Sequence, residues 1–161
     1  MKAWIAVLCL VLAPLGAQAQ QPNQLVGTWK LVSNTLDPAG RRSDTLGRKP
    51  HGTLIFTADG HYTLFMSRAG LPRFDGNNRE RGTDDENRAI VRGTLAHSGR
   101  YTVDEAAGRF AWQVEFSTFP NWNNTTQTRT FTISGDELHY TNPSASGAPD
   151  KPLQAVWLRA R

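Results

Sequence analysis

The sequence predicts an all-β fold, an eight-stranded antiparallel up-and-down barrel with one short helix between the third and fourth strands. Two observations predict it. Apolar residues alternate with polar ones at period two within several segments, and the connections between these segments alternate between short turns and long loops. Successive connections of a meander fall at opposite ends of the sheet, so the tight turns gather at a closed base and the long loops at an open mouth. Closure into a barrel would protect the two edge strands.

Period-two alternation locates the strands. Along residues 110–117, apolar side chains occupy one face and mostly polar side chains the other, as in a sheet with one wet side. Residues 62–66 and 129–133 alternate in a similar way, and Thr, Val, Phe and Tyr, which fit a pleated surface, dominate these segments. The expected strands are residues 24–33, 52–57, 61–67, 98–104, 109–119, 126–134, 137–142 and 153–160.

The connections between these strands fall into two groups. Short hairpin turns are expected at residues 59–60, 104–108 and 134–136, where Asp, Ser and Gly supply turn chemistry. The long connections are rich in Gly, Pro, Asn and Arg and span residues 34–51, 68–97, 120–125 and 143–152.

One helix is expected within the connection 68–97. Thr83 is followed three residues later by Glu86, the spacing of a capping box, and helix formers continue to Ala96 despite Gly93. The sequence therefore predicts a helix over residues 84–96 at the mouth end. This helix could cover the opening as a lid or pack on the outside of the barrel.

Residues 1–19 have the pattern of a secretory signal peptide. Lys2 supplies the positive start, residues 4–15 form an apolar run too short to span a bilayer comfortably, and Ala17-Gln18-Ala19 is a small-x-small cleavage site. We expect cleavage after Ala19, export to the periplasm or the medium, and one domain over residues 20–161. No stable membrane insertion is expected after cleavage.

The charge balance of the expected mature chain is mildly basic. Lys2 is the only charged residue of the leader, so 17 of the 18 Lys and Arg remain against 14 Asp and Glu. Many of them lie in the long loops, at Arg41, Arg42, Arg48, Lys49, Arg68, Arg73, Arg79 and Arg81. Such residues are typical of a solvated surface, but their place around the mouth also favours attraction of anionic ligands. Nucleic acid is not an expected partner, because no aromatic-and-basic binding motif appears.

Gly27-Thr28-Trp29 and Arg159 resemble the lipocalin pairing in which an arginine packs over the tryptophan of a Gly-x-Trp motif at the closed end. More closely, the chain resembles the small bacterial and fungal lipocalin-like domain family. The resemblance implies a barrel with a cavity and structural roles for Gly27, Trp29 and Arg159. The chain departs from the family pattern at Trp112 and Gln113, where histidine is common, so no role of that histidine is carried over. The matching stretches are residues 25–33, 52–60, 99–104, 119–122, 127–129, 138 and 157–159.

Metal binding and nucleophilic catalysis are not indicated. His51 and His97 are expected to begin strands at the mouth and His61 and His139 at the base, and no His-x-His or His-x-x-x-His spacing occurs. We therefore expect surface or turn roles for the histidines, and no metal or cofactor. The expected mature chain lacks cysteine, and no Gly-x-Ser-x-Gly elbow is present to activate a serine.

A polar set near the mouth carries the functional candidates. Gln127 and Arg129 share a face with Phe131, so an inward apolar face would bring Arg129 into the upper barrel, where a buried arginine needs a partner. Glu115, on the neighbouring strand, shares the face opposite Phe116, so it reaches Arg129 only if a bulge intervenes. Arg129 therefore either packs against a wall or forms an ordinary ion pair, or it offers a positive handle to an anionic head group.

Two functions follow from this sequence. The first is a carrier or sensor of a small hydrophobic or amphipathic molecule held in the cavity. The second is a small isomerase or cyclase that uses the same cavity, with Glu115 as acid or base and Arg129 stabilising negative charge. A barrel filled by its own side chains is a third outcome. The expected cavity lining is Leu31, Leu54, Phe56, Leu64, Met66, Tyr101, Phe116, Gln127, Arg129, Phe131 and Tyr140.

Overall fold

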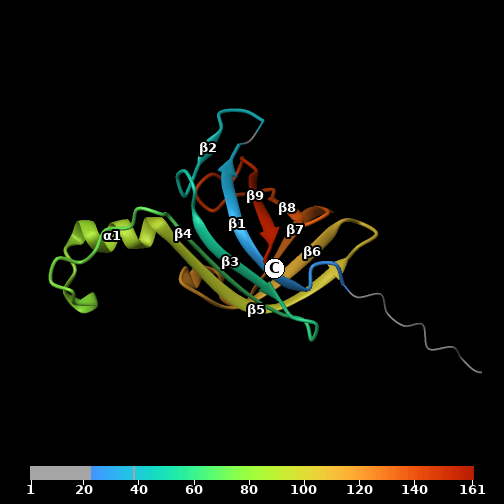
Figure 1. Ribbon diagram of the computed structural model, residues 1–161, viewed down its shortest axis with the longest axis horizontal. Helices are drawn as coiled ribbons and strands as arrows, with labels where there is room; N and C mark the ends of the chain where they lie inside the picture. Colours follow the sequence, from blue (N-terminus) through green and yellow to red (C-terminus); the bar gives the residue numbers. More distant parts are fainter. Residues whose placement is uncertain (1–22, 38) are drawn as a thin grey trace, which may run out of the picture.

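The protein folds into a closed antiparallel β-barrel with a helix that projects from it (Figure 1). The computed structural model describes residues 23–37 and 39–161, so the expected signal peptide at residues 1–19 lies outside the described residues. Every strand from β3 onward pairs with the next one along the chain, and β1 closes the barrel by pairing with both β3 and β9. The predicted eight-stranded antiparallel barrel is confirmed.

Eight long strands form the wall, and the two-residue strand β2 extends it at the outer end of β1. β2 lies in the connection 34–51, which the sequence predicts as a loop. The strands are β1 (Gly27–Leu36), β2 (Ser43–Asp44), β3 (His51–Phe56), β4 (His61–Ser67), β5 (Thr94–Asp104), β6 (Arg109–Ser117), β7 (Thr125–Ser134), β8 (Glu137–Asn142) and β9 (Leu153–Arg159).

Two strands extend further toward the mouth than the sequence predicts. β1 continues to Leu36 rather than ending at residue 33, because its last residues pair with β9 on one side and β2 on the other. β5 begins at Thr94 rather than at residue 98, because its first residues pair with the end of β4. These extensions add wall at the mouth end, where the sequence predicts loop and helix.

The helix α1 spans Asp84–Gly93 and begins with the predicted capping box. The Glu86 backbone N–H donates to Thr83 Oγ1, and the Thr83 backbone N–H donates to Glu86 Oε2 at 2.7 Å. The predicted end at residue 96 is wrong, because the residues after Gly93 enter the sheet as β5. Two 3-10 turns, Arg79–Arg81 and Pro120–Trp122, complete the helical content of the described residues.

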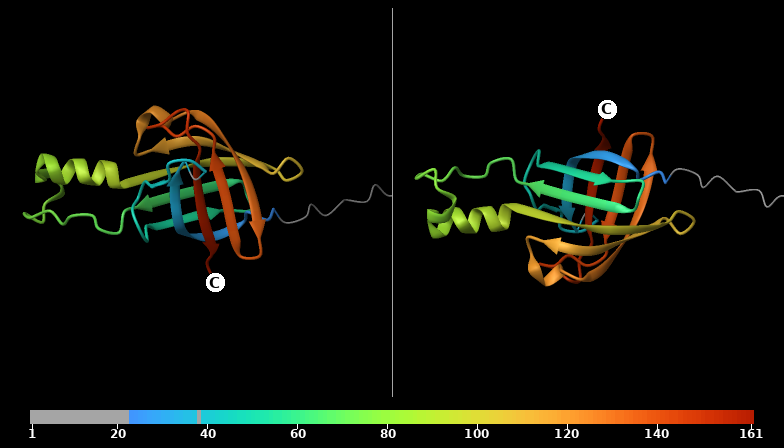
Figure 2. Two further views of the ribbon diagram at one scale, coloured as in Figure 1. Left: turned by 90° about the horizontal axis from the view of Figure 1, so that it is seen from above. Right: turned by 90° about the horizontal axis from the view of Figure 1, so that it is seen from below.

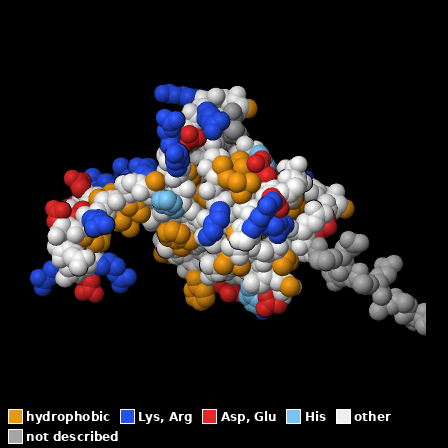
Figure 3. Space-filling model, viewed as in Figure 1, with side chains coloured by type: hydrophobic (Ala, Val, Ile, Leu, Met, Phe, Trp, Pro, Cys, Tyr) orange, Lys and Arg blue, Asp and Glu red, His pale blue; other side chains and the backbone are white. Residues whose placement is uncertain are grey.

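The structure does not place α1 over the opening as a lid, which is one of the two positions that the sequence leaves open. Figures 1 and 2 show α1 and the chain leading to it extending away from the barrel. On this arm, residues 68–93, Arg side chains are interspersed with Asp and Glu on the visible face (Figure 3). None of the described helices is long and apolar enough to cross a membrane.

The closed end contains the predicted contact between Trp29 and Arg159. Trp29 is fully buried, and the Arg159 guanidinium carbon lies 4.0 Å from the centroid of its ring. The guanidinium also donates to the carbonyl oxygens of Val26 and Gln24, each at 2.8 Å. Gly27 permits this approach, because a Cβ there would lie 2.7 Å from Arg159 Nη1 and its φ is +134°. The closed end is therefore a packed and hydrogen-bonded unit.

Two β-bulges interrupt the alternation toward the mouth. On β6 the register shifts between Val114 and Phe116, so Glu115 is an extra residue opposite the Ser98–Gly99 step of β5. On β1 the register shifts between Leu31 and Ser33, so Val32 is an extra residue opposite β9. A one-residue insertion exchanges the inner and outer faces of every residue beyond it. The bulges therefore decide which side chains face the upper barrel.

Candidate functional site

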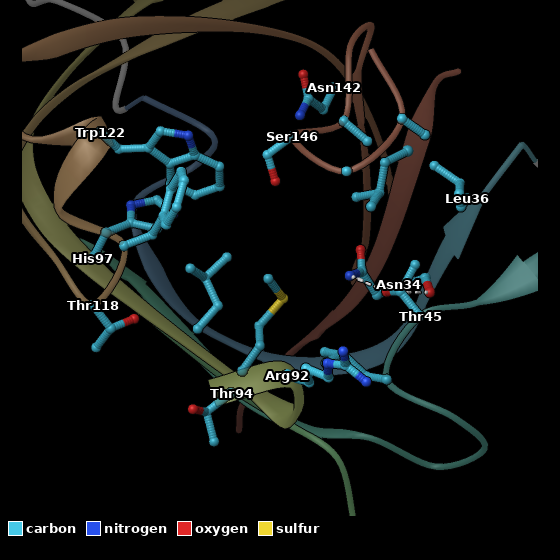
Figure 4. Close-up of a pocket in the computed structure, with 18 of the residues that line it drawn as sticks. Asn34, Leu36, Thr45, Arg92, Thr94, His97, Thr118, Trp122, Asn142 and Ser146 are labelled. Carbon is cyan, nitrogen blue, oxygen red and sulfur yellow. Dashed lines mark hydrogen bonds between the residues drawn. The ribbon is translucent and has the colours of Figure 1, made fainter. Parts of the chain in front are cut away.

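A pocket of about 720 Å³ occupies the mouth half of the barrel (Figure 4). Its strand residues come from the mouth ends of β1, β4, β5, β8 and β9 and from the inner faces of β6 and β7. The remaining lining comes from the long connections and from α1, through Thr45, Leu46, Ile90, Val91, Arg92, Thr118, Phe119, Trp122 and residues 145–148. The long loops thus gather around the pocket, as the predicted arrangement of base and mouth requires.

An aromatic cluster forms one wall of the pocket. The ring of Trp112 stacks on Tyr62, with centroids 5.2 Å apart, and meets the edge of Tyr140 at 5.4 Å. His97 packs against Trp112 at 4.9 Å and against Trp122 at 5.8 Å, in both cases edge to face. Such a wall suits a flat, apolar ligand, because aromatic rings prefer offset-stacked or edge-to-face partners.

His97 is buried beside this wall and is held by a hydrogen bond between its Nδ1 and the Tyr62 hydroxyl, at 2.9 Å. Burial lowers the pKa of His97 to about 3, with a smaller contribution from the nearby Arg129 charge. Burial also raises the pKa of the Tyr62 hydroxyl well above its ordinary value. Both groups are therefore neutral at ordinary pH, and the expectation that every histidine is a surface or turn residue is wrong for His97.

Arg129 points inward, as the alternation predicts, and is 5% exposed. It donates from Nη2 to Gln127 Oε1 at 2.6 Å and from Nη1 to the Thr128 carbonyl oxygen at 2.9 Å. Its guanidinium carbon lies 5.1 Å from the centroid of Trp112, and its Nε has no hydrogen-bond partner within residues 23–37 and 39–161. Burial lowers the pKa of Arg129. Among the described residues, no carboxylate pairs with it.

A second, shallower groove also reaches Arg129. It lies beside β7, where residues 125–129 pair with β6 but not with β8, and the loop after β8 forms its other side. Gln127 lines this groove and joins it to the pocket through its hydrogen bond with Arg129. Arg129 is therefore reached from two sides.

The opposite wall of the pocket carries an amide. Asn34 and Thr45 lie across the pocket from His97 and Trp122 in Figure 4. Asn34 donates from Nδ2 to Thr45 Oγ1 at 2.9 Å, and in the described part of the chain its buried Oδ1 has no partner. One wall is thus aromatic and contains Arg129, whereas the other presents the neutral acceptor of Asn34, with Arg92 nearby in the lining.

The structure brings together only part of the predicted cavity lining. Met66, Arg129 and Tyr140 line the pocket, and Gln127 lines the adjoining groove. The eight loop Lys and Arg residues expected around the mouth do not line the pocket. The other predicted residues that face inward fill the barrel below the pocket or pack against that core: Leu31, Leu54, Phe56, Leu64, Tyr101 and Phe131.

The bulge on β6 removes Phe116 and Glu115 from the predicted site. Val114 faces the core, Glu115 is the extra exposed residue, and Phe116 is 70% exposed on the outside of the barrel. Without the bulge, Phe116 would share the inward face of Trp112 and Val114. The acid or base of the enzymatic alternative is therefore not beside Arg129 in the pocket.

Several lining residues were missed by the sequence interpretation. His97 and Leu95 lie on the same face of β5 as Tyr101 and Gly99, so period-two alternation contains a signal for them once β5 is extended upstream. Asn34 and Leu36 face the pocket because of the β1 bulge, for which the sequence offers no clear signal. Among the described residues, no group of three His, Cys, Asp or Glu is placed to hold a metal ion.

Comparison with known proteins relates the chain to a protein family, to a fungal carrier protein and to a solved bacterial structure. Residues 26–159 match the family model described as a lipocalin-like domain. The 4'-hydroxy-3'-methoxypropiophenone carrier protein of Aspergillus oryzae is 42% identical over 102 residues, which cover 58% of this chain and 92% of that protein. The crystal structure of Rv2717c from M. tuberculosis aligns with a TM-score of 0.33 and 17% identity, covering 94% of this chain and 100% of that one.

Proposed function

We propose that this chain, which belongs to the lipocalin-like domain family, binds and carries a small hydrophobic or amphipathic aromatic molecule in its barrel pocket. The observation that carries the proposal is the aromatic wall of His97, Trp112, Trp122 and Tyr140 around a pocket of about 720 Å³. Ligand pockets have volumes of roughly 300–1,000 Å³ and are mostly apolar with a few placed polar groups. The Aspergillus relative, whose name gives an aromatic ketone as its cargo, supports the same class of ligand.

Carriage accounts for the pocket better than the isomerase or cyclase alternative. General acid-base catalysis requires a titratable group within hydrogen-bond reach of the reacting atoms. Glu115, the candidate for that role, is exposed on the bulge of β6. His97 and Tyr140 do line the pocket, but burial lowers the pKa of His97 to about 3 and raises that of Tyr140 to about 12, so neither is poised to exchange protons near neutral pH.

Calorimetric titration with 4'-hydroxypropiophenone tests the proposal. We expect saturable binding at one site, and Trp122→Ala should weaken it by about tenfold, because a ring contact and the apolar area around it are lost. Phe116→Ala is the matched control, since it removes an aromatic ring from the outside of the barrel and should leave affinity unchanged. Absence of saturable binding by the wild type, or equal losses in both variants, would contradict the pocket as the binding site.

We also propose that the protein acts after export, with residues 1–19 removed. The support is the leader pattern, from Lys2 through the apolar run to Ala17-Gln18-Ala19. Intact-mass measurement of protein from the periplasm or the medium should give a chain that begins at Gln20. A mature protein that still carries residues 1–19 would contradict both the cleavage and the localisation.

A further inference from the structure

We propose that the wall formed by His97, Trp112 and Arg129 binds an anionic oxygen carried on an aromatic ring, a phenolate or a carboxylate, with Arg129 as its counter-ion. This inference rests on the proposed function and adds to it the chemical class and the orientation of the ligand. The charged end of the ligand would lie against β5, β6 and β7, and its apolar part would extend toward the mouth.

The charge of Arg129 is the first argument. Its side chain is 5% exposed, and within the described part of the chain it donates hydrogen bonds to two neutral oxygens, Gln127 Oε1 and the Thr128 carbonyl oxygen. A buried cation loses its hydration, and a neutral acceptor compensates less than an anion does, because charge-assisted hydrogen bonds are roughly twice as strong as neutral ones. An anion bound next to Arg129 would therefore be held more tightly than a neutral ligand of the same shape.

The unpartnered polar atoms of this wall are the second argument. Arg129 Nε and Trp112 Nε1 are both buried N–H donors that find no acceptor among the residues the structure describes. Such donors are costly unless a ligand or water accepts from them. Both residues line the pocket, and the Arg129 guanidinium carbon lies 5.1 Å from the Trp112 ring centroid. An oxygen acceptor in this corner is what the two donors lack.

The hydrogen bond of His97 gives the third donor. Tyr62 is buried and protonated, so its hydroxyl proton needs a hydrogen-bond acceptor. Among the described residues that acceptor is His97 Nδ1, so the hydroxyl donates and the ring nitrogen accepts. The proton of the neutral His97 ring is then on Nε2, which makes that nitrogen a donor as well. The wall therefore presents N–H groups of three residues. An anionic oxygen can accept from all of them, whereas a ligand hydroxyl would carry a proton that needs an acceptor of its own.

Spectrophotometric pH titration of bound 4'-hydroxypropiophenone tests the inference, because the phenol and the phenolate absorb at different wavelengths. The wild type should lower the pKa of the bound phenol by about 1 to 3, as a cation within contact distance does. Arg129→Met should abolish this shift, and Arg129→Lys should retain part of it. Arg100→Met, which removes an exposed arginine from β5, is the matched control and should keep the full shift.

Two further ligands separate the possible outcomes. The methyl ether 4'-methoxypropiophenone cannot ionise, so Arg129→Met should leave its affinity within about twofold of wild type while weakening the phenolate by about ten- to a hundredfold. 4-Methoxybenzoate decides between the two anions, since tighter binding of the benzoate than of the phenolate at a pH above the phenol pKa would assign the wall to a carboxylate. Equal losses for ether and phenolate, or an unshifted phenol pKa in wild type, would overturn the inference while the pocket still binds its ligand. If none of the three ligands binds, the proposed function itself fails.

Discussion

Replacing Trp29 with alanine should lower the free energy of unfolding by about 3–5 kcal/mol. The indole is fully buried, its Nε1 donates to the Leu25 carbonyl oxygen at 2.8 Å, and Arg159 lies over its face. Truncation would remove the packing of the closed end and leave both the Leu25 carbonyl and the guanidinium without this partner. Urea unfolding followed by far-ultraviolet circular dichroism measures the loss without using tryptophan fluorescence.

Two variants calibrate this prediction. Arg159→Ala should cost about 1–2 kcal/mol, because it removes the stacking and two hydrogen bonds but leaves the indole packed. Phe65→Ala, which removes an aromatic ring that is 46% exposed on the outer face of β4, should cost clearly less than Trp29→Ala. A Trp29→Ala protein no less stable than Phe65→Ala would show that the closed end does not hold the barrel together.

The closed half of the barrel was predictable because its strands are regular. Tyr62 and Leu64 on β4 and Phe110 and Trp112 on β6 all point inward, as unbroken period-two alternation requires. The tight turns fix the register between these strands, since a hairpin with a short loop permits few offsets. The Trp29 and Arg159 contact followed from a resemblance to other barrels, not from the alternation.

The pocket was only partly predictable because the alternation changes where the site begins. Phe116 was placed inside and Asn34 was not considered, and each lies just beyond a bulge. A bulge reflects local pairing between two strands that are distant in sequence, so a periodicity along one segment does not reveal it. Arg129 could be predicted because β7 has no register shift between Thr125 and Ser134.

The sequence interpretation of His97 failed for a different reason. The sequence predicts a helix that continues to residue 96, which makes His97 the first residue of a strand rather than part of its inward face. Helix propensity alone would allow the helix to continue through Ala96. However, Thr94 to His97 pair with β4, and these backbone hydrogen bonds are more than one further helical turn at the barrel rim would form. Tertiary pairing thus decided the boundary, and with it one residue of the pocket wall.

Replacing Gly99 with alanine should lower the free energy of unfolding by about 3 kcal/mol. Gly99 has φ +158° and lies opposite the bulge of β6. A Cβ at this position would overlap the Gln113 carbonyl oxygen and approach the Glu115 backbone nitrogen to 2.8 Å. Both neighbours are backbone atoms, so no side-chain rotation relieves the overlap and the two strands must separate.

The same substitution should weaken ligand binding, because separation of β5 from β6 moves His97 relative to Trp112, whose rings now lie 4.9 Å apart. Gly76→Ala is the matched control: a Cβ there meets no atom within 4 Å, so stability and affinity should stay close to wild type. Thermal unfolding and calorimetric titration of both variants provide the comparison. If Gly99→Ala retains wild-type stability, the bulge tolerates a side chain at residue 99. In that case β6 does not need a glycine opposite it to direct Phe116 out of the pocket.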